Sequence, residues 1–260
     1  MRHKLRIMAT YKKRGDKRAK KKGDDHIEEQ STTAEVFNTL DESASKTEEW
    51  VARNQKYILS AIGIVVLGIL GYLGYSQFIQ APKETEASNE LFFAQQYFDQ
   101  AVTAADNDSL YNLALNGGEG KYGLLDIIDK YKGTKAANLA KYSAGMAYLN
   151  MNKYTEAVSF LEGFSSDDAI LGALAKGGLG DAFTQLNQLE DALDYYEKAV
   201  SHDNNEFTTP RFLLKAGITA MELNQNDKAI GYFKRIKDEY SDTQEGRTVD
   251  TYIGKAEALK

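Results

Sequence analysis

Residues 179–200 read LGDAFTQLNQLEDALDYYEKAV, and the same pattern recurs on both sides of this segment. Residues 144–161 read AGMAYLNMNKYTEAVSFL, and residues 216–236 read AGITAMELNQNDKAIGYFKRI. In each copy a glycine precedes an alanine, and a polar turn that contains asparagine lies between them: Gly145 and Ala157, Gly180 and Ala192, Gly217 and Ala229. This spacing predicts stacked helix–turn–helix units, because small residues let paired helices touch. Large residues are expected to fill the gaps between repeats: Leu161, Tyr196 and Phe233.

The pattern resembles the tetratricopeptide repeat (TPR), whose usual period is about 34 residues. The early glycine, the tyrosine (Tyr148) and the alanine are matched, whereas the early tryptophan and the closing proline are mostly missing. The resemblance implies an all-α solenoid in which a last helix covers the exposed apolar edge. The expected parts are a degenerate repeat at residues 88–132, repeats at residues 138–171, 173–206 and 210–243, and a capping helix at residues 247–260.

The expected first repeat contains an insertion at residues 106–123. Within it, residues 117–121 read GGEGK and faintly resemble a phosphate-binding loop. Tyr122 stands where such a loop needs Ser or Thr for magnesium, so we expect a flexible loop instead.

The chain has no charged residue between Lys56 and Lys83. Residues 57–80 read YILSAIGIVVLGILGYLGYSQFIQ and are apolar on every side of a helix. About 20 such residues, rising about 1.5 Å each, cross a hydrocarbon layer of about 30 Å. We therefore expect a single transmembrane helix that acts as an uncleaved signal anchor, rather than the buried helix of a soluble core. Lys and Arg are denser before this helix, which predicts a cytoplasmic N-terminus and an extracytoplasmic domain at residues 81–260.

Small residues recur on one face of the predicted membrane helix, and such a face lets another helix approach closely. The expected packing positions are Ser60, Gly63, Leu67, Gly71 and Gly74. Glycine is common in membrane helices in any case, so the face could also lack a partner. The span contains no charged group, and we do not expect it to carry ions or protons by itself.

Residues 1–31 are strongly charged. Residues 1–22 contain eleven Lys or Arg, and residues 23–49 contain nine Asp or Glu. This composition predicts a disordered cytoplasmic tail. A basic run of this kind could instead bind anionic lipids or RNA.

Residues 32–56 are expected to form an amphipathic cytoplasmic helix. Thr32 and Glu35 have the spacing of a capping box, and apolar residues follow at helical intervals. The helix either lies passively on the lipid headgroups or docks a partner. The anchors for docking would be Phe37, Leu40 and Trp50.

The composition argues against several classes of site. The chain has no cysteine, which excludes disulfides and lipid-modified cysteine, and its three histidines show no zinc-ligand spacing. We expect no metal, no cofactor and no enzymatic activity, because no nucleophile–base or paired-carboxylate arrangement is evident. Residues 81–260 contain 18 basic and 28 acidic residues, which argues against nucleic acid as a partner of this domain.

What remains is protein binding. In the TPR pattern the first helix of each repeat lines a groove, and apolar side chains that include methionine suit polypeptide segments. The alternative is that several of these side chains pack under the capping helix or form core. The predicted groove positions are Leu139, Tyr142, Met146, Leu149, Asn150, Leu174, Asp181, Thr184, Gln185, Arg211, Leu214, Ile218, Met221 and Glu222.

An anchor followed by an acidic, cysteine-free repeat domain resembles the YfgM family, whose members are ancillary subunits of the bacterial SecYEG translocon. The similar segments are YKGTKAANLAKYSAGMAYL (residues 131–149) and LLKAGITAMELNQNDKAIGYFKRI (residues 213–236). The resemblance covers roughly residues 50–260, and the long tail departs from it. It implies an inner-membrane protein with a periplasmic domain that contacts Sec translocon subunits and a PpiD-type membrane-anchored peptidyl-prolyl isomerase, and that passes emerging chains to periplasmic chaperones.

Two other interpretations stay open. The protein could be a structural scaffold for an envelope assembly, such as cell division or secretion machinery, without client binding. It could also be an RNA or lipid sensor driven by the basic tail, in which case the repeats would be dispensable.

Overall fold

The computed structural model describes residues 32–104 and 107–260, so the predicted disordered tail lies outside the described residues. Within those two ranges all regular elements are helices, which confirms the all-α prediction. The chain divides into two compact units, Met1–Leu70 and Gly71–Lys260. Each unit is described by itself below.

The first unit contains most of α1 (Thr32–Tyr75), a single helix that joins the expected amphipathic segment to the apolar one. Leu40 and Trp50 are exposed, whereas the side chains of the capping box and of Phe37 lie outside the described part. The apolar side chains from Leu59 onward are also exposed. Among the described residues, one helix is long and apolar enough to cross a membrane.

The second unit starts with the end of α1, continues through a π-helical turn, η1 (Ser76–Gln80), and enters α2 (Ala81–Thr103). The residues on both sides of position 80 are helical, so helical structure continues across the expected boundary between the membrane span and the next domain. Pro82 lies in the first turn of α2, directly after the π-helical turn; it has no backbone N–H to donate, and a π-helical turn is a usual irregularity at such a point of a continuing helix. Four alanine and leucine side chains of α2 are buried in the unit: Ala87, Leu91, Ala94 and Ala101.

The expectation of an insertion at residues 106–123 is wrong in part, because α3 (Asp108–Asn116) lies within it and is followed by α4 (Leu124–Lys130). Helix α3 forms because Tyr111, Ala114 and Leu115 fall on one face and are buried against the neighbouring helices. The glycine-rich turn after α3 is closely folded. A Cβ atom at Gly117, where φ is +81°, would lie 2.2 Å from a backbone carbonyl oxygen.

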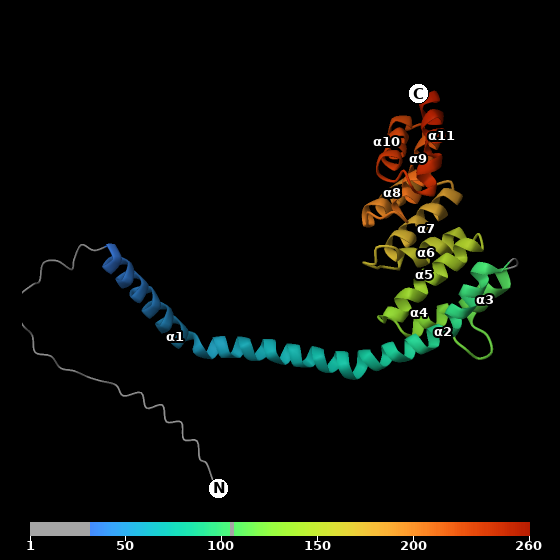
Figure 1. Ribbon diagram of the computed structural model, residues 1–260. Helices are drawn as coiled ribbons and strands as arrows, with labels where there is room; N and C mark the ends of the chain where they lie inside the picture. Colours follow the sequence, from blue (N-terminus) through green and yellow to red (C-terminus); the bar gives the residue numbers. More distant parts are fainter. Residues whose placement is uncertain (1–31, 105–106) are drawn as a thin grey trace, which may run out of the picture. The chain divides into compact units, whose positions relative to one another are not determined.

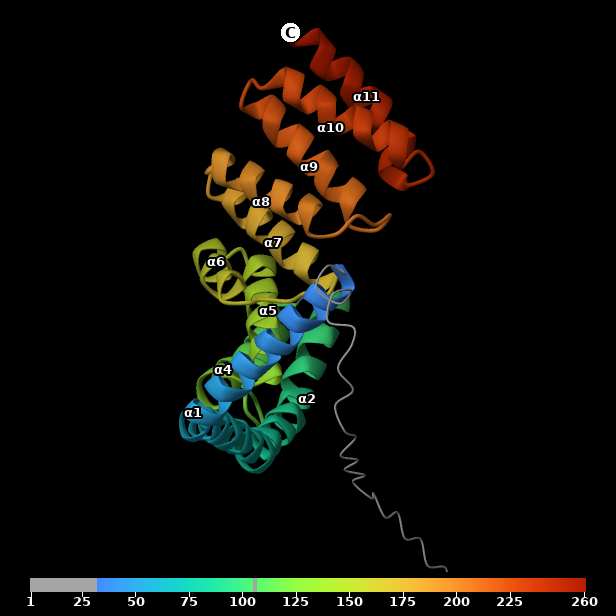
Figure 2. The ribbon, with the colours of Figure 1, turned by 90° about the vertical axis from the view of Figure 1, so that its left-hand side faces the viewer.

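The following helices form pairs that stack in chain order toward the C-terminus (Figures 1 and 2). The last helix, α11, lies at the position expected for the capping helix and begins three residues earlier than residue 247, since Thr243 caps it by accepting a bond from the N–H of Gly246. The elements are α5 (Lys135–Asn150) with α6 (Tyr154–Glu162), α7 (Leu171–Gln185) with α8 (Leu189–His202), α9 (Thr209–Glu222) with α10 (Asn226–Glu239), and α11 (Gln244–Ala258).

The repeating glycines have a direct packing role. Within each pair the glycine of the first helix lies beneath the large residue of the second. A Cβ atom would lie 2.5 Å from Leu161 at Gly145, 2.5 Å from Tyr196 at Gly180 and 2.2 Å from Phe233 at Gly217. The large residues therefore pack first on their own repeat, and only then on the next one, as in the stacking of Tyr196 on Phe212 with ring centroids 6.3 Å apart.

The turns inside the three pairs share a backbone conformation. Asn152, Asn187 and Asn224 have φ values of 58°, 58° and 59°, in the left-handed region that asparagine tolerates better than most residues. The N–H of the next residue then donates to a carbonyl near the end of the preceding helix; in the second repeat Gln188 donates to Phe183 at 2.9 Å. The asparagines noted in the sequence thus end the first helix of each pair.

Candidate functional site

The predicted groove residues all lie on the first helices of the three pairs, α5, α7 and α9. None of them is fully buried, and the four polar or charged residues at the outer positions are exposed: Asn150, Gln185, Arg211 and Glu222. The others are half-buried: Leu139, Tyr142, Met146, Leu149, Leu174, Asp181, Thr184, Leu214, Ile218 and Met221. The groove itself stays a prediction. What it could bind depends on the contacts that these side chains already make within the fold.

The residues of α5 and α7 meet around Gly178. A Cβ atom at that glycine would lie 3.2 Å from the sulfur of Met146 and 3.9 Å from a methyl carbon of Leu149. Both side chains therefore take part in the packing of α5 on α7, and only their outer parts are available to a ligand.

A polar cluster lies between α7 and α9. Asp181 forms an ion pair with Lys215, and its carboxylate accepts a hydrogen bond of 2.7 Å from the Tyr196 hydroxyl. The Thr184 hydroxyl lies 3.2 Å from the same tyrosine oxygen. The side chains of Lys215 and Asp181 are 30% and 29% exposed, so the ion pair is partly shielded from water. Burial raises the pKa of Tyr196 far above its usual value, and the negative charge of Asp181 adds to this effect. The phenol therefore stays protonated and can donate its hydrogen bond.

Sequence reasoning missed Lys215 and Tyr196 as members of this cluster. The signal for Lys215 was present, because it lies four residues after Arg211 and three before Ile218 and therefore shares their helix face. The spacing of Tyr196 predicts only a space-filling role and does not reveal that its hydroxyl reaches Asp181 and Thr184 on the first helix.

Four apolar groove positions also pack against the carboxyl-terminal core. Leu174, Leu214, Ile218 and Met221 contact the buried cluster that includes Val249 and Ala256 of α11. Both interpretations of these side chains thus have support in the packing, since they contribute to the core and remain half-exposed.

The middle of α5 and the first turn of α9 bring aromatic and cationic groups together. The rings of Tyr142 and Phe164 are tilted against each other with centroids 5.3 Å apart. Burial raises the pKa of Tyr142, and the positive charge of Arg211 on α9 opposes that effect. This part of the predicted groove therefore places the Arg211 guanidinium near an aromatic surface.

Arg211 also lines a cleft of about 660 Å³ between the α8–α9 connection and the α10–α11 turn. Its walls carry four carboxylates, and Phe207 at its edge is 63% exposed. Sequence reasoning did not find this cleft, because its walls come from segments far apart in the chain. The lining residues are Glu206, Phe207, Arg211, Glu239, Tyr240, Ser241, Asp242, Thr243, Gln244 and Glu245.

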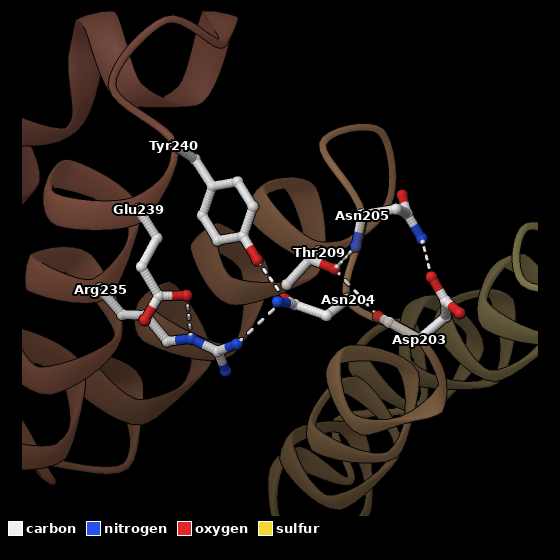
Figure 3. A network of polar contacts seen from close by, with 7 residues as sticks. All are labelled: Asp203, Asn204, Asn205, Thr209, Arg235, Glu239 and Tyr240. Carbon is white, nitrogen blue, oxygen red and sulfur yellow. Dashed lines mark hydrogen bonds and ion pairs between the residues drawn. The ribbon is translucent and has the colours of Figure 1, made fainter.

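Hydrogen bonds fix the connection that carries Phe207 (Figure 3). The amide oxygen of Asn204 accepts bonds from the Tyr240 hydroxyl and, at 3.2 Å, from the Arg235 guanidinium, both on or directly after α10. The backbone N–H of Asn205 donates to the Thr209 hydroxyl at 3.0 Å, and that hydroxyl donates to the carbonyl of Asp203 at 3.0 Å. These hydrogen bonds therefore hold the α8–α9 connection in a defined conformation against α9 and α10.

The predicted membrane-packing face is open in the described chain. A Cβ atom at Gly63, Gly71 or Gly74 would meet nothing within 4 Å. Leu67 is 71% exposed, and the Ser60 hydroxyl donates within its own helix to the carbonyl of Lys56 at 2.8 Å. Whether another helix packs here stays a prediction.

No group of three or more His, Cys, Asp or Glu side chains that could hold a metal ion occurs among the residues the structure describes. The one histidine in the repeats has structural contacts. His202 Nδ1 lies 3.0 Å from the Lys176 ammonium, and its Nε2 lies 3.0 Å from the carbonyl oxygen of Asp168.

Models of the tetratricopeptide repeat match three segments of the chain. One matches residues 140–163 and 175–206, and another matches residues 212–243. These segments fall on the pairs α5–α6, α7–α8 and α9–α10, so the chain carries tetratricopeptide repeats, which act as scaffolds for protein–protein interaction and are generally non-catalytic. No curated protein matches the chain, and the resemblance to the YfgM family therefore stays a hypothesis.

Proposed function

We propose that this chain is a single-pass membrane scaffold without catalytic activity, whose tetratricopeptide repeats bind polypeptide segments outside the cytoplasm. The observation that carries the proposal is the apolar helix, whose side chains are exposed and which leads without a break into the repeat domain. Exposed apolar residues over such a length have no stable place in water, and a bilayer is the environment that covers them.

The side chains along α5, α7 and α9 support the binding role. They combine half-exposed leucine, isoleucine and methionine with an embedded ion pair, Asp181 with Lys215, and with the exposed guanidinium of Arg211. Apolar surface supplies affinity for an extended segment, and fixed polar groups orient its backbone or its charged side chains. A flexible methionine such as Met221 adapts to more than one sequence.

The finer assignment comes from the resemblance stated above. In that interpretation the protein lies in the bacterial inner membrane, with its repeats in the periplasm. It contacts Sec translocon subunits through the predicted membrane-packing face (Ser60, Gly63, Leu67, Gly71 and Gly74), meets a PpiD-type isomerase, and passes emerging chains to periplasmic chaperones.

Photo-crosslinking in intact cells tests this proposal. A photoreactive residue at Gln185 samples the predicted groove, since this position is exposed, whereas Met146 contacts α7. A second at Gly71 samples the membrane helix, and a third at Ser201, exposed on α8, is the control. Translocon subunits captured from Gly71, with emerging chains or an isomerase from Gln185, support the proposal. One division or secretion component captured from both positions, without a Sec subunit, would replace it with the structural-scaffold interpretation.

The orientation needs a separate measurement, which the absence of native cysteine makes simple. A single cysteine at Ser241, in the exposed turn before α11, should react with a membrane-impermeant maleimide added outside the cytoplasmic membrane. A cysteine at Thr10, in the tail, should react only after the membrane is opened. The opposite pattern would place the repeats in the cytoplasm and remove the translocon-exit role.

A further inference from the structure

The turn between α4 and α5 is held beside the point where the apolar helix ends. The side-chain amide of Gln80 donates to the carbonyl of Gly133 at 2.9 Å, and the Lys83 ammonium donates to the carbonyl of Lys132 at 2.8 Å. At the next residue, the Glu84 carboxylate accepts the backbone N–H of Lys135 at 2.7 Å. Three consecutive contacts thus fix residues that are some fifty positions away in the sequence.

The apolar segment ends directly before these contacts. Phe78 and Ile79 are 81% and 57% exposed, and Gln80 is the next residue. Since a helix rises about 1.5 Å per residue, Lys83 lies only about 6 Å along the axis from Ile79. If residues 57–80 span a bilayer, as the proposed function requires, the α4–α5 turn lies at the level of the lipid headgroups.

The turn carries an unusual charge for this domain. Lys130, Lys132 and Lys135 occur within six positions and are all exposed, whereas residues 81–260 as a whole have ten more acidic than basic residues. The nearby acids are partly engaged. Glu84 caps the amino end of α5, and Asp129 pairs with Lys132 at 2.6 Å in a contact whose two side chains are 77% and 74% exposed.

An ion pair so open to water contributes little and is easily exchanged, so Lys132 stays available to another anion. The outer side of the turn is also uncovered. Gly133 has a φ of +86°, and a Cβ atom at this position would meet nothing within 4 Å. A flat, charged surface can therefore approach the backbone of the turn without displacing protein atoms.

We propose that the α4–α5 turn, residues 130–135, rests on the membrane surface and binds the phosphate groups of anionic phospholipids through the ammonium groups of Lys130, Lys132 and Lys135. Each lysine near an anionic membrane surface contributes about 1 kcal/mol, which corresponds to roughly a fivefold change in lipid preference. The acidic remainder of the domain is repelled by the same lipids, so the contact is confined to this turn.

The test uses the full chain in lipid nanodiscs of phosphatidylcholine, with or without phosphatidylglycerol. A nitroxide on a single cysteine at Asp129 retains all three lysines, and its relaxation by a nickel-chelating lipid headgroup reports proximity to the surface. Labels at Ile79 and at Ser201 serve as references inside the span and on α8. We expect surface contact at Asp129, strengthened several-fold by phosphatidylglycerol, and none at Ser201.

Two lysine-to-glutamine triple variants distinguish lipid binding by the turn lysines from an effect of the net charge of the domain. Substitution at positions 130, 132 and 135 should abolish the phosphatidylglycerol dependence, whereas substitution of the exposed Lys228, Lys234 and Lys255 should retain it. Contact that is equal with and without phosphatidylglycerol would overturn the proposal. An Asp129 label that stays in water while the Ile79 label lies in lipid would also overturn it and leave the anchored scaffold intact. An Ile79 label in water would overturn both.

Discussion

Replacing Gly217 with alanine should destabilise the third repeat, because no space exists for the added methyl group. Its Cβ atom would lie 2.2 Å and 2.6 Å from two ring carbons of Phe233, far inside normal van der Waals contact. The ring cannot swing away easily, since Phe233 is completely buried and packs against Tyr252 with ring centroids 5.6 Å apart. The alanine therefore has to move the two helices of the repeat apart.

Two effects of opposite sign decide the magnitude. Overpacking of this kind costs about 1–3 kcal/mol, whereas exchanging glycine for alanine inside a helix gains about 1 kcal/mol. The net loss at Gly217 is then roughly 0–2 kcal/mol. Gly231, in the middle of α10, is the matched control, because a Cβ atom there meets nothing within 4 Å and only the gain applies. The two variants should therefore differ by about 1–3 kcal/mol.

Thermal unfolding of the full chain in detergent, followed by far-UV circular dichroism, measures this difference. At about 2–4 °C per kcal/mol for a domain of this size, the Gly217→Ala variant should melt at least a few degrees below the Gly231→Ala variant. Adding Phe233→Leu should reduce the cost of Gly217→Ala, and a double-mutant cycle gives the coupling. Equal melting temperatures for the two alanine variants would refute the close-packing argument.

Three further predictions use the same unfolding assay. Asn187→Gly should leave the melting temperature nearly unchanged, because glycine adopts a φ of 58° without strain. Asn187→Val should lower it by the equivalent of about 1–3 kcal/mol, because a β-branched residue is strained at that angle. Equal melting temperatures for the two variants would exclude a backbone cause. Glu84→Gln should cost about 1 kcal/mol by weakening the charged cap on α5, and no change at low salt would contradict that role. Burial is the larger cause that raises the pKa of Tyr131 to about 12, and the carboxylate of Glu86 adds to it. The protonated phenol therefore stabilises the fold below pH 10.0, the pKa in the unfolded chain, and this stability is lost as the pH rises toward 12. Tyr131→Phe should remove this pH-dependent loss of melting temperature.

The sequence was sufficient for the repeats because their packing depends on residue size at fixed spacing. Gly180 and Tyr196 are sixteen positions apart, as are the equivalent residues of the other two copies, so one local pattern predicts both the helix pair and its contact. Helix α3 was missed because its buried face consists only of Tyr111, Ala114 and Leu115, between a polar stretch and a glycine-rich turn. Three residues are too few for a periodic signal to stand out.

The candidate site was less predictable, for a different physical reason. Helix-face rules place Arg211 and Ile218 on the first-helix surface, but they do not reveal which of these side chains also fill the core. Likewise, the contact of Asp181 with Lys215 joins two repeats, and its existence depends on the angle between them. Contacts between repeats, which decide what a ligand meets, have no signature within one repeat.

The link between the apolar helix and the repeats limits how the proposed scaffold could work. Helix α2 is no flexible linker, because Ala87, Leu91 and Ala94 are buried in the repeat domain and Glu84 caps α5. A partner that contacts Gly71 and Gly74 and a segment bound along α5, α7 and α9 would therefore be held by one compact unit, residues 71–260. A flexible tether would bring the two together only through an effective concentration that falls with linker length. A packed helix sets their separation directly, and this geometry favours a scaffold that presents a segment at a defined place beside its membrane partner.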